Sequence, residues 1–301
     1  MKLYAPTYYK NFQCIADACE HSCCIGWEID IDETTLQKYK KLKSGYGATV
    51  CNSIVWDETP HFRLCEGERC PHLDERGLCK IILEVGEDHL SDICREHPRF
   101  YNFTSVAEVG LGMSCPEAAR LILSSPDFAK MEEIGEVATE QDDGISFDGR
   151  AERKRVYAVL QENDYASALA QIYGAYSIGV GEDNQWLNVI DSLEYLNPAH
   201  RALLMQYSSA RRPADGKAEE YCKRFLAYLV YRHCTEAFDG EDFAVRLAFC
   251  LFCERLLASL ICARGAETLY EIAALASILS EEIEYSDDNT WALMNVNAED
   301  E

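Results

Sequence analysis

Cysteine residues are concentrated in the first part of the chain, where ten of the fifteen precede Pro116. An opening group lies in the stretch FQCIADACEHSCC, and a second series follows it with wider spacing. The members of the two groups are Cys14, Cys19, Cys23 and Cys24, then Cys65, Cys70, Cys79, Cys94 and Cys115. Thiols this dense form disulfides, bind a metal ion or an iron–sulfur cluster, or carry out redox chemistry.

Metal or cluster binding is the chemistry that we expect. The candidate ligands, of which a site needs four, are Cys14, Cys19, Cys23, Cys24, Cys70, Cys79, Cys94 and Cys115. The adjacent Cys23 and Cys24 cannot easily both ligate one ion with ideal geometry, so we expect both groups to contribute to one site. The alternative is that several of these thiols are small buried hydrophobic side chains.

Zinc and iron–sulfur centres both accept four thiolates. Structural zinc sites usually carry paired Cys-x2-Cys knuckles. Here the cysteines are separated more widely and less regularly, which favours an iron–sulfur cluster. We expect a cluster of the 4Fe–4S type, with zinc as the alternative cofactor. The Cys-x3-Cys-x2-Cys signature of radical chemistry is absent from the sequence, because Cys23 is followed directly by Cys24.

Histidines and later cysteines give weaker signals. His21, His72, His89 and His97 lie among the candidate ligands and could each replace a thiolate, although a histidine beside such a site more often supports it from outside. Five cysteines fall in apolar helical patterns, where core packing is the expected role: Cys222, Cys234, Cys250, Cys253 and Cys262.

The elements that must position these residues indicate a mainly α protein. We expect a cysteine-rich loop-and-helix unit over 1–125 organised around the metal or iron–sulfur site, an acidic connecting segment over 126–150, and a helical domain over 151–301. Within the first unit, helices are predicted at Thr34–Lys43 and Pro116–Ser124. Ser114 or Cys115 would cap the second helix, with proline in its first turn.

Charge and hydropathy limit the classes of partner. The net charge of −24 disfavours nucleic-acid binding, because the surface would repel phosphates. The most apolar stretch, Phe243 to Cys262, is interrupted by charged residues and is not expected to span a membrane. The first residues contain no apolar signal-peptide core, so we expect a cytoplasmic protein with reduced thiols.

Four motifs in order resemble the flagellin lysine N-methylases, which form part of a broader group of zinc- or iron-chelating proteins named for a Cys-x2-Cys-x2-Cys-Cys pattern. The motifs are FQCIADACEHSCC, CPHLDERGLC, LSDICREHPRFYN and LGMSCPEAARLIL. Cys14, Cys19, Cys23 and Cys24 match the pattern with wider gaps. Cys70, Cys79 and Cys94 match its later cysteines, and Cys115 matches the Ser-Cys-Pro-Glu segment of the methylase branch. The helix FLAYLVYRHCTEAF is also similar to that branch.

This resemblance implies methyl transfer from S-adenosylmethionine to lysine side chains of flagellin, with an iron–sulfur cluster as cofactor. It assigns neither catalytic residues nor a methyl-donor site. Two non-enzymatic alternatives stay open: a metal- or cluster-binding carrier protein, and a zinc-stapled interaction module.

Overall fold

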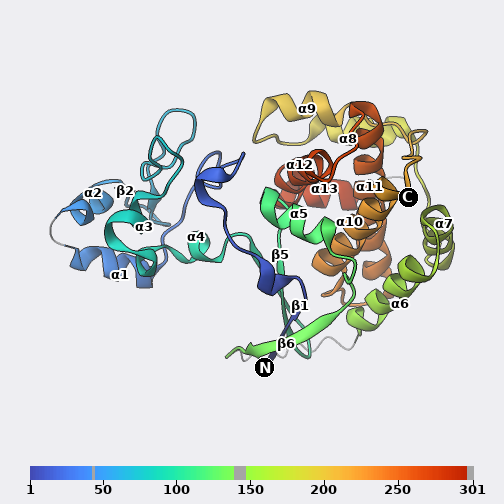
Figure 1. The fold of residues 1–301 in the computed structure, drawn as a ribbon, viewed down its shortest axis with the longest axis horizontal. Helices are drawn as coiled ribbons and strands as arrows, with labels where there is room; N and C mark the ends of the chain where they lie inside the picture. The colour runs from blue at the N-terminus through green and yellow to red at the C-terminus, as the bar shows by residue number, and fades with distance from the viewer. Residues whose placement is uncertain (43–44, 139–146, 297–301) are drawn as a thin grey trace. The chain divides into compact units, whose positions relative to one another are not determined.

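The computed structural model describes residues 1–42, 45–138 and 147–296. The chain forms two compact units, which are described separately (Figure 1). Gln13–Pro98 form the cysteine-rich unit, and Met1–Phe12 together with Arg99–Glu301 form the helical unit. The cysteine-rich unit is therefore narrower than the range 1–125 expected from the sequence, because both ends of that range fold with the later helices.

The cysteine-rich unit consists of short elements joined by turns. Its elements are η2 (Ala16–Ala18), α1 (Glu33–Lys41), α2 (Tyr46–Asn52), β2 (Ile54–Val55), β3 (His61–Phe62), α3 (Lys80–Val85), η3 (Glu87–His89) and α4 (Asp92–Glu96). A small core that includes Ile29, Leu36, Tyr39 and Phe62 holds them together, and Cys70 is part of it. The unit is thus loop-rich, as expected.

Asp32 joins two helices of this unit. Its Oδ1 accepts a hydrogen bond from the Thr35 backbone N–H at 2.9 Å and caps α1, while its Oδ2 accepts one from the Asp92 N–H at 2.9 Å. Asp92 is the first residue of α4, so one carboxylate satisfies free N–H groups at two helix starts. The helix expected at Thr34–Lys43 runs from Glu33 to Lys41, and residue 43 lies outside the described residues.

The helical unit begins with a sheet of order β4-β5-β1-β6, in which β1 pairs in parallel with β5. Its elements are β1 (Lys2–Pro6), η1 (Tyr9–Asn11), β4 (Arg99–Phe103), β5 (Ala107–Leu111), α5 (Pro116–Ser124), β6 (Met131–Glu136), α6 (Gly149–Glu162), α7 (Tyr165–Ala175), α8 (Asp183–Ser192), α9 (Pro198–Leu204), α10 (Gly216–Cys234), α11 (Gly240–Arg264), α12 (Leu269–Leu279), the π-helical turn η4 (Ser280–Glu284) and α13 (Asp287–Met294). The expectation of a mainly α chain is confirmed.

Two local predictions have different outcomes. The helix at Pro116–Ser124 is confirmed, with Cys115 at the N-cap position and proline in the first turn. The segment 126–150 is not only a connection, because Met131–Glu136 forms a strand antiparallel to β1. This strand was missed because it is rich in glutamate, which is rare in strands but common where an edge strand faces water. Residues 139–146 of that segment lie outside the described residues.

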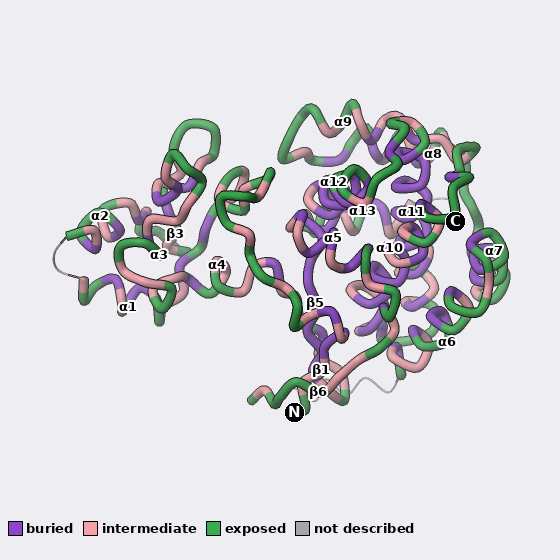
Figure 2. Tube along the Cα trace, in the orientation of Figure 1, coloured by how far each residue is buried: buried purple, intermediate pink, exposed green. Residues whose placement is uncertain are grey.

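The core of the helical unit is built on α10 and α11, whose traces are largely buried (Figure 2). Asp239 caps the start of α11 by accepting from the Asp242 N–H, and Gly265 ends it in the left-handed conformation. Apolar residues surround α11 on nearly every side, which explains why its hydrophobic pattern is almost continuous. Within the described ranges, no helix combines the length and hydropathy needed to cross a bilayer.

Candidate metal centre

Seven of the eight candidate ligands belong to the cysteine-rich unit. The eighth, Cys115, belongs to the helical unit, where it precedes α5 and is half-buried. Cys14 is exposed, and its sulfur accepts a hydrogen bond from the Ala16 N–H at 3.4 Å. Cys19 is partly exposed and lies close enough to Cys14 and Cys23 to interact with them electrostatically.

The two cysteine groups meet through backbone pairing. The Cys70 N–H donates to the Cys24 carbonyl oxygen at 2.8 Å, and the Gly26 N–H donates to the Glu68 carbonyl oxygen at 3.1 Å. An antiparallel bridge joins Ile25 and Arg69 between these two bonds. The segment that carries Cys23 and Cys24 is therefore fixed against the turn that carries Cys70, as a site shared by both groups requires.

Five thiols gather in this unit and interact electrostatically with one another: Cys23, Cys24, Cys70, Cys79 and Cys94. Burial raises the pKa of Cys70 to about 11 and that of Cys94 to about 12, and it also raises the pKa of Cys79. Burial disfavours the thiolate because a charge is poorly solvated there. A positively charged metal centre is the kind of group that would stabilise these thiols as thiolates.

Cys23 differs from its neighbours. The adjacent Cys24 thiol donates to it, and this hydrogen bond lowers the pKa of Cys23 to about 7 against the opposing effect of burial. The same interaction raises the pKa of Cys24. Within the adjacent pair, Cys24 is therefore the hydrogen-bond donor and Cys23 the acceptor.

Helix starts position two of the five thiols. Cys79 is the N-cap residue of α3, and the N–H groups of Ile81 and Ile82 lie near enough to its sulfur to favour the thiolate. Cys94 lies in α4, whose start is held by Asp32. Backbone N–H groups directed at sulfur are a feature of thiolate-ligated clusters, where they tune the charge on the ligand.

His72 and Tyr39 complete the surroundings of the thiols. His72 is 1% exposed, and its two ring nitrogens contact Tyr46 Oη at 2.7 Å and Ser53 Oγ at 2.8 Å. Burial lowers its pKa to about 4, so the ring is neutral and both nitrogens are already engaged. Tyr39, a residue that the sequence reasoning missed, is buried near Cys94, Cys79 and Cys70 and donates to the His89 carbonyl oxygen.

A single metal ion requires its sulfur ligands to lie close together. A tetrahedral zinc with bonds of about 2.3 Å places its sulfurs about 3.8 Å apart. Among the residues that the structure describes, no three cysteine sulfurs all lie within 4.8 Å of one another.

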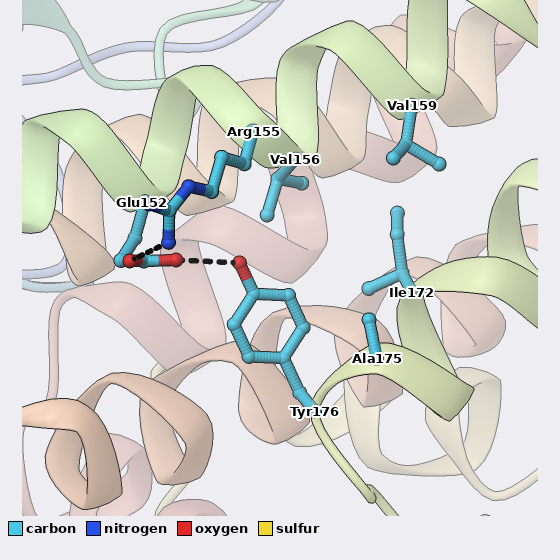
Figure 3. A pocket seen from close by; sticks show the side chains of 7 residues that line it. All are labelled: Glu152, Arg155, Val156, Val159, Ile172, Ala175 and Tyr176. Atoms are coloured by element: carbon cyan, nitrogen blue, oxygen red, sulfur yellow. Dashed lines mark hydrogen bonds and ion pairs between the residues drawn. The ribbon is translucent and has the colours of Figure 1, made fainter.

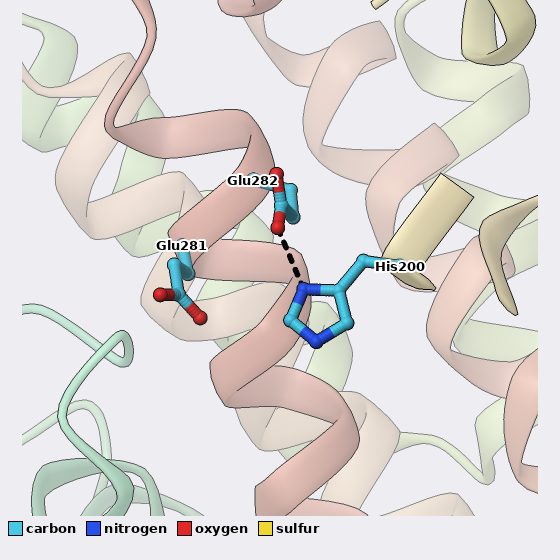
Figure 4. A group of neighbouring side chains, drawn as sticks. All are labelled: His200, Glu281 and Glu282. Carbon is cyan, nitrogen blue, oxygen red and sulfur yellow. Dashed lines mark hydrogen bonds and ion pairs between the residues drawn. The ribbon is translucent and has the colours of Figure 1, made fainter. Parts of the chain in front are cut away.

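One other group of potential ligands lies in the helical unit. His200, Glu281 and Glu282 bring their ligand atoms within 4.8 Å of one another (Figure 4). The buried Glu282 already accepts hydrogen bonds from the Leu196 and Asn197 N–H groups and from His200 Nδ1 at 2.6 Å. These bonds hold the start of α9 on η4, so the arrangement is explained without an ion.

The later cysteines largely follow the expectation of core packing. Cys222, Cys234, Cys250 and Cys253 are buried, and the sulfurs of Cys234 and Cys250 lie 3.7 Å apart. Burial raises the pKa of Cys250 and Cys253, which makes both thiols unreactive. The expectation was wrong for Cys262, which is exposed in the last turn of α11.

Comparison with known proteins gives three related curated sequences. The flagellar biosynthetic protein FliU of Salmonella muenchen is 32% identical over 133 residues, which cover 40% of this chain and 77% of FliU. Two proteins named lysine-N-methylase, from Salmonella choleraesuis and Salmonella typhimurium, are each 31% identical over 139 residues, or 42% of this chain. The chain spans about a third of the length of these two methylases, since the match covers 34% of each.

No family model matches the chain, and no solved structure matches it. The match to FliU nevertheless extends over more than two thirds of that protein. The chain therefore belongs to the same family as the flagellar biosynthetic protein FliU.

Proposed function

We propose that this protein transfers methyl groups from S-adenosylmethionine to lysine side chains of flagellin in the cytoplasm. The observation that carries the proposal is the 31% identity to two proteins named lysine-N-methylase. The flagellar name of FliU supports flagellin as the substrate. The strongly acidic chain, with a net charge of −24, suits a substrate segment that presents lysines.

The reaction requires a neutral amine. The lysine nitrogen attacks the sulfonium methyl carbon, a nitrogen–carbon bond forms as the carbon–sulfur bond breaks, and S-adenosylhomocysteine leaves with the electron pair of the broken bond. The lysine ammonium must first lose a proton to water or a base, because only the neutral amine has a free electron pair with which to attack. This displacement needs no radical, which agrees with the absence of the radical Cys-x3-Cys-x2-Cys signature.

We further propose that thiols of the cysteine-rich unit hold an iron–sulfur cluster. The ligands would come from Cys23, Cys24, Cys70, Cys79 and Cys94, which gather there although they are separated in sequence. The donor set consists of thiols alone, and burial disfavours their thiolate forms unless a positively charged centre compensates, so both features support a thiolate-bound metal centre of this kind. When bound, it would tie these segments together, as metal sites in small units do.

Anaerobic purification followed by iron, sulfide and zinc analysis tests the cofactor. Iron and sulfide in similar amounts, with broad absorbance near about 400 nm, are expected of a cluster. Stoichiometric zinc without sulfide would replace the cluster with a zinc site and leave the methylation proposal to its own test.

The activity is tested by incubating the purified protein with S-adenosylmethionine and the flagellin of its own source organism. Intact-mass spectra should show flagellin gaining increments of about 14 Da, one for each methyl group added to lysine. Lysine assignments come from peptide fragmentation. Flagellin that keeps its original mass with a metal-replete protein would reject the methylase proposal and favour the metal- or cluster-carrier alternative.

A further inference from the structure

A hollow of about 230 Å³ lies between α6 and α7 in the helical unit (Figure 3). Pockets that bury drug-sized ligands usually measure about 300–1,000 Å³. The hollow is smaller than such a pocket and has room for one side chain or a small molecule. It is lined by Glu152, Arg155, Val156, Val159, Ile172, Ala175 and Tyr176.

The hollow has an apolar wall and one acidic end. Val159, Ile172 and Ala175 lie together at one side, whereas Glu152 and Tyr176 meet at the other (Figure 3). The Tyr176 hydroxyl donates to Glu152 Oε2 at 3.0 Å, and burial together with this bond raises the pKa of Tyr176. The tyrosine therefore stays protonated and orients the carboxylate. An elongated ligand with an apolar stem and a cationic head complements this lining.

Arg155 already forms an ion pair with Glu152, and this pair decides how easily another cation can enter. The Arg155 side chain is 72% exposed, whereas that of Glu152 is 19% exposed. Releasing an exposed arginine into water loses little, because surface ion pairs contribute little net stability. An incoming cation that also buries an apolar stem can therefore displace it.

We propose that this pocket binds a lysine side chain of the protein substrate, with its four-carbon stem along Val159 and Ile172 and its ammonium on Glu152. The assignment of that substrate rests on the proposed function. An uncharged apolar side chain would add no contact to the Glu152 carboxylate, which would keep only Arg155 and Tyr176 as partners.

The pocket is a docking site and not the place of methyl transfer. A carboxylate beside an amine favours the ammonium form, which cannot attack a methyl group. The lysine bound here would therefore be a neighbour of the lysine that is methylated. Its loss should weaken substrate binding, raise KM and leave kcat largely unchanged.

Two substitutions and two matched controls test the proposal. Glu152→Gln removes the charge, and Ala175→Trp fills the hollow from an exposed position at the end of α7. Glu162→Gln and Ala166→Trp make the same changes at exposed positions of α6 and α7 outside the lining. We expect each pocket variant to raise KM for flagellin about fivefold or more. Glu152→Gln removes the charge contact with the ammonium, and Ala175→Trp occupies the space of the lysine stem. The controls should match the wild type.

Direct binding keeps this test separate from the methylation assay. N-acetyl-lysine methylamide should shift NMR signals of Val159 and Ile172, and N-acetyl-norleucine methylamide, which has the stem without the ammonium, should do so far more weakly. The lysine compound binding equally to the wild type and to Glu152→Gln would overturn the proposal, as would an unchanged KM in both pocket variants. Binding without any methylation would support the pocket and reject only the proposed function.

Discussion

The backbone N–H of Cys70 donates a 2.8 Å hydrogen bond to the carbonyl oxygen of Cys24. This bond joins the opening cysteine group to the later series, although a helix pair and a short hairpin separate them along the chain. Cys24 and Cys70 both lie in segments without helix or strand structure. The hydrogen bond between them and the neighbouring backbone bonds therefore fix the positions of these thiols. The geometry of the proposed site thus depends on long-range backbone pairing as much as on the cysteines themselves.

Replacing Cys79 or Cys94 with serine should lower bound iron and sulfide by at least half and destabilise the cysteine-rich unit, because metal binding is coupled to folding. Inductively coupled plasma analysis and thermal denaturation measure the two effects. The control is Cys250→Ala, which should cost about 1–2 kcal/mol of stability through the small cavity it leaves and keep the full metal content. Equal metal in all three variants would show that these thiols are not ligands.

Asp32→Ala should destabilise the cysteine-rich unit by about 1–3 kcal/mol, because it removes hydrogen bonds at the starts of α1 and α4. Urea denaturation monitored by tryptophan fluorescence measures the change. Asp88→Ala alters an exposed acidic residue of the same unit and should stay within about 0.5 kcal/mol of the wild type. If both substitutions changed the free energy of unfolding by similar amounts, the hydrogen bonds of Asp32 to the two helix starts would not be a specific source of stability.

Local sequence signals predicted the helical elements well. Pro116 and Glu117 mark the start of α5, and the 3.6-residue spacing of apolar residues marks α10. The cysteine pattern named eight candidate ligands without showing which of them lie together, and five of the eight gather in the cysteine-rich unit: Cys23, Cys24, Cys70, Cys79 and Cys94. Each of these features depends on neighbours in sequence or on residue type alone.

Features that depend on distant partners could not be predicted in this way. The parallel pairing of β1 with β5 draws the first residues into the helical unit, and nothing near Leu3 encodes its partner Ala107. Both ring nitrogens of His72 form hydrogen bonds, and their partners Tyr46 and Ser53 are distant in sequence and approach the ring only in the folded chain. Cys262 resembles its buried neighbours in sequence, and only the packing of α11 shows that its side faces solvent.

Glu254 should make stability depend on pH. It is fully buried in α11 and accepts a hydrogen bond from Tyr165, and burial raises its pKa from 4.5 to about 7. Because the folded-state pKa lies above the unfolded value, its stabilising contribution is complete below about pH 4.5 and is lost as the pH rises through about 7. The loss is on the order of 3 kcal/mol.

The difference in unfolding free energy between Glu254→Gln and the wild type, measured by urea denaturation from pH 4.5 to pH 8, should therefore shift in favour of the variant as the pH rises. Glu241→Gln, at an exposed position of the same helix, serves as the matched control and should show a nearly constant difference. A constant difference for Glu254→Gln as well would mean that its carboxyl titrates alike in both states.

Transfer of an isotopically labelled methyl group from S-adenosylmethionine to flagellin tests the central claim most directly. With a trideuterated donor, each modified lysine should gain about 17 Da per methyl group, which separates new methylation from any already present. The initial rate should also rise as the pH increases from neutrality, because the free amine is the nucleophile and lysine has a pKa of about 10.4. Flagellin that acquires no labelled methyl group from metal-replete protein at any pH would contradict the account.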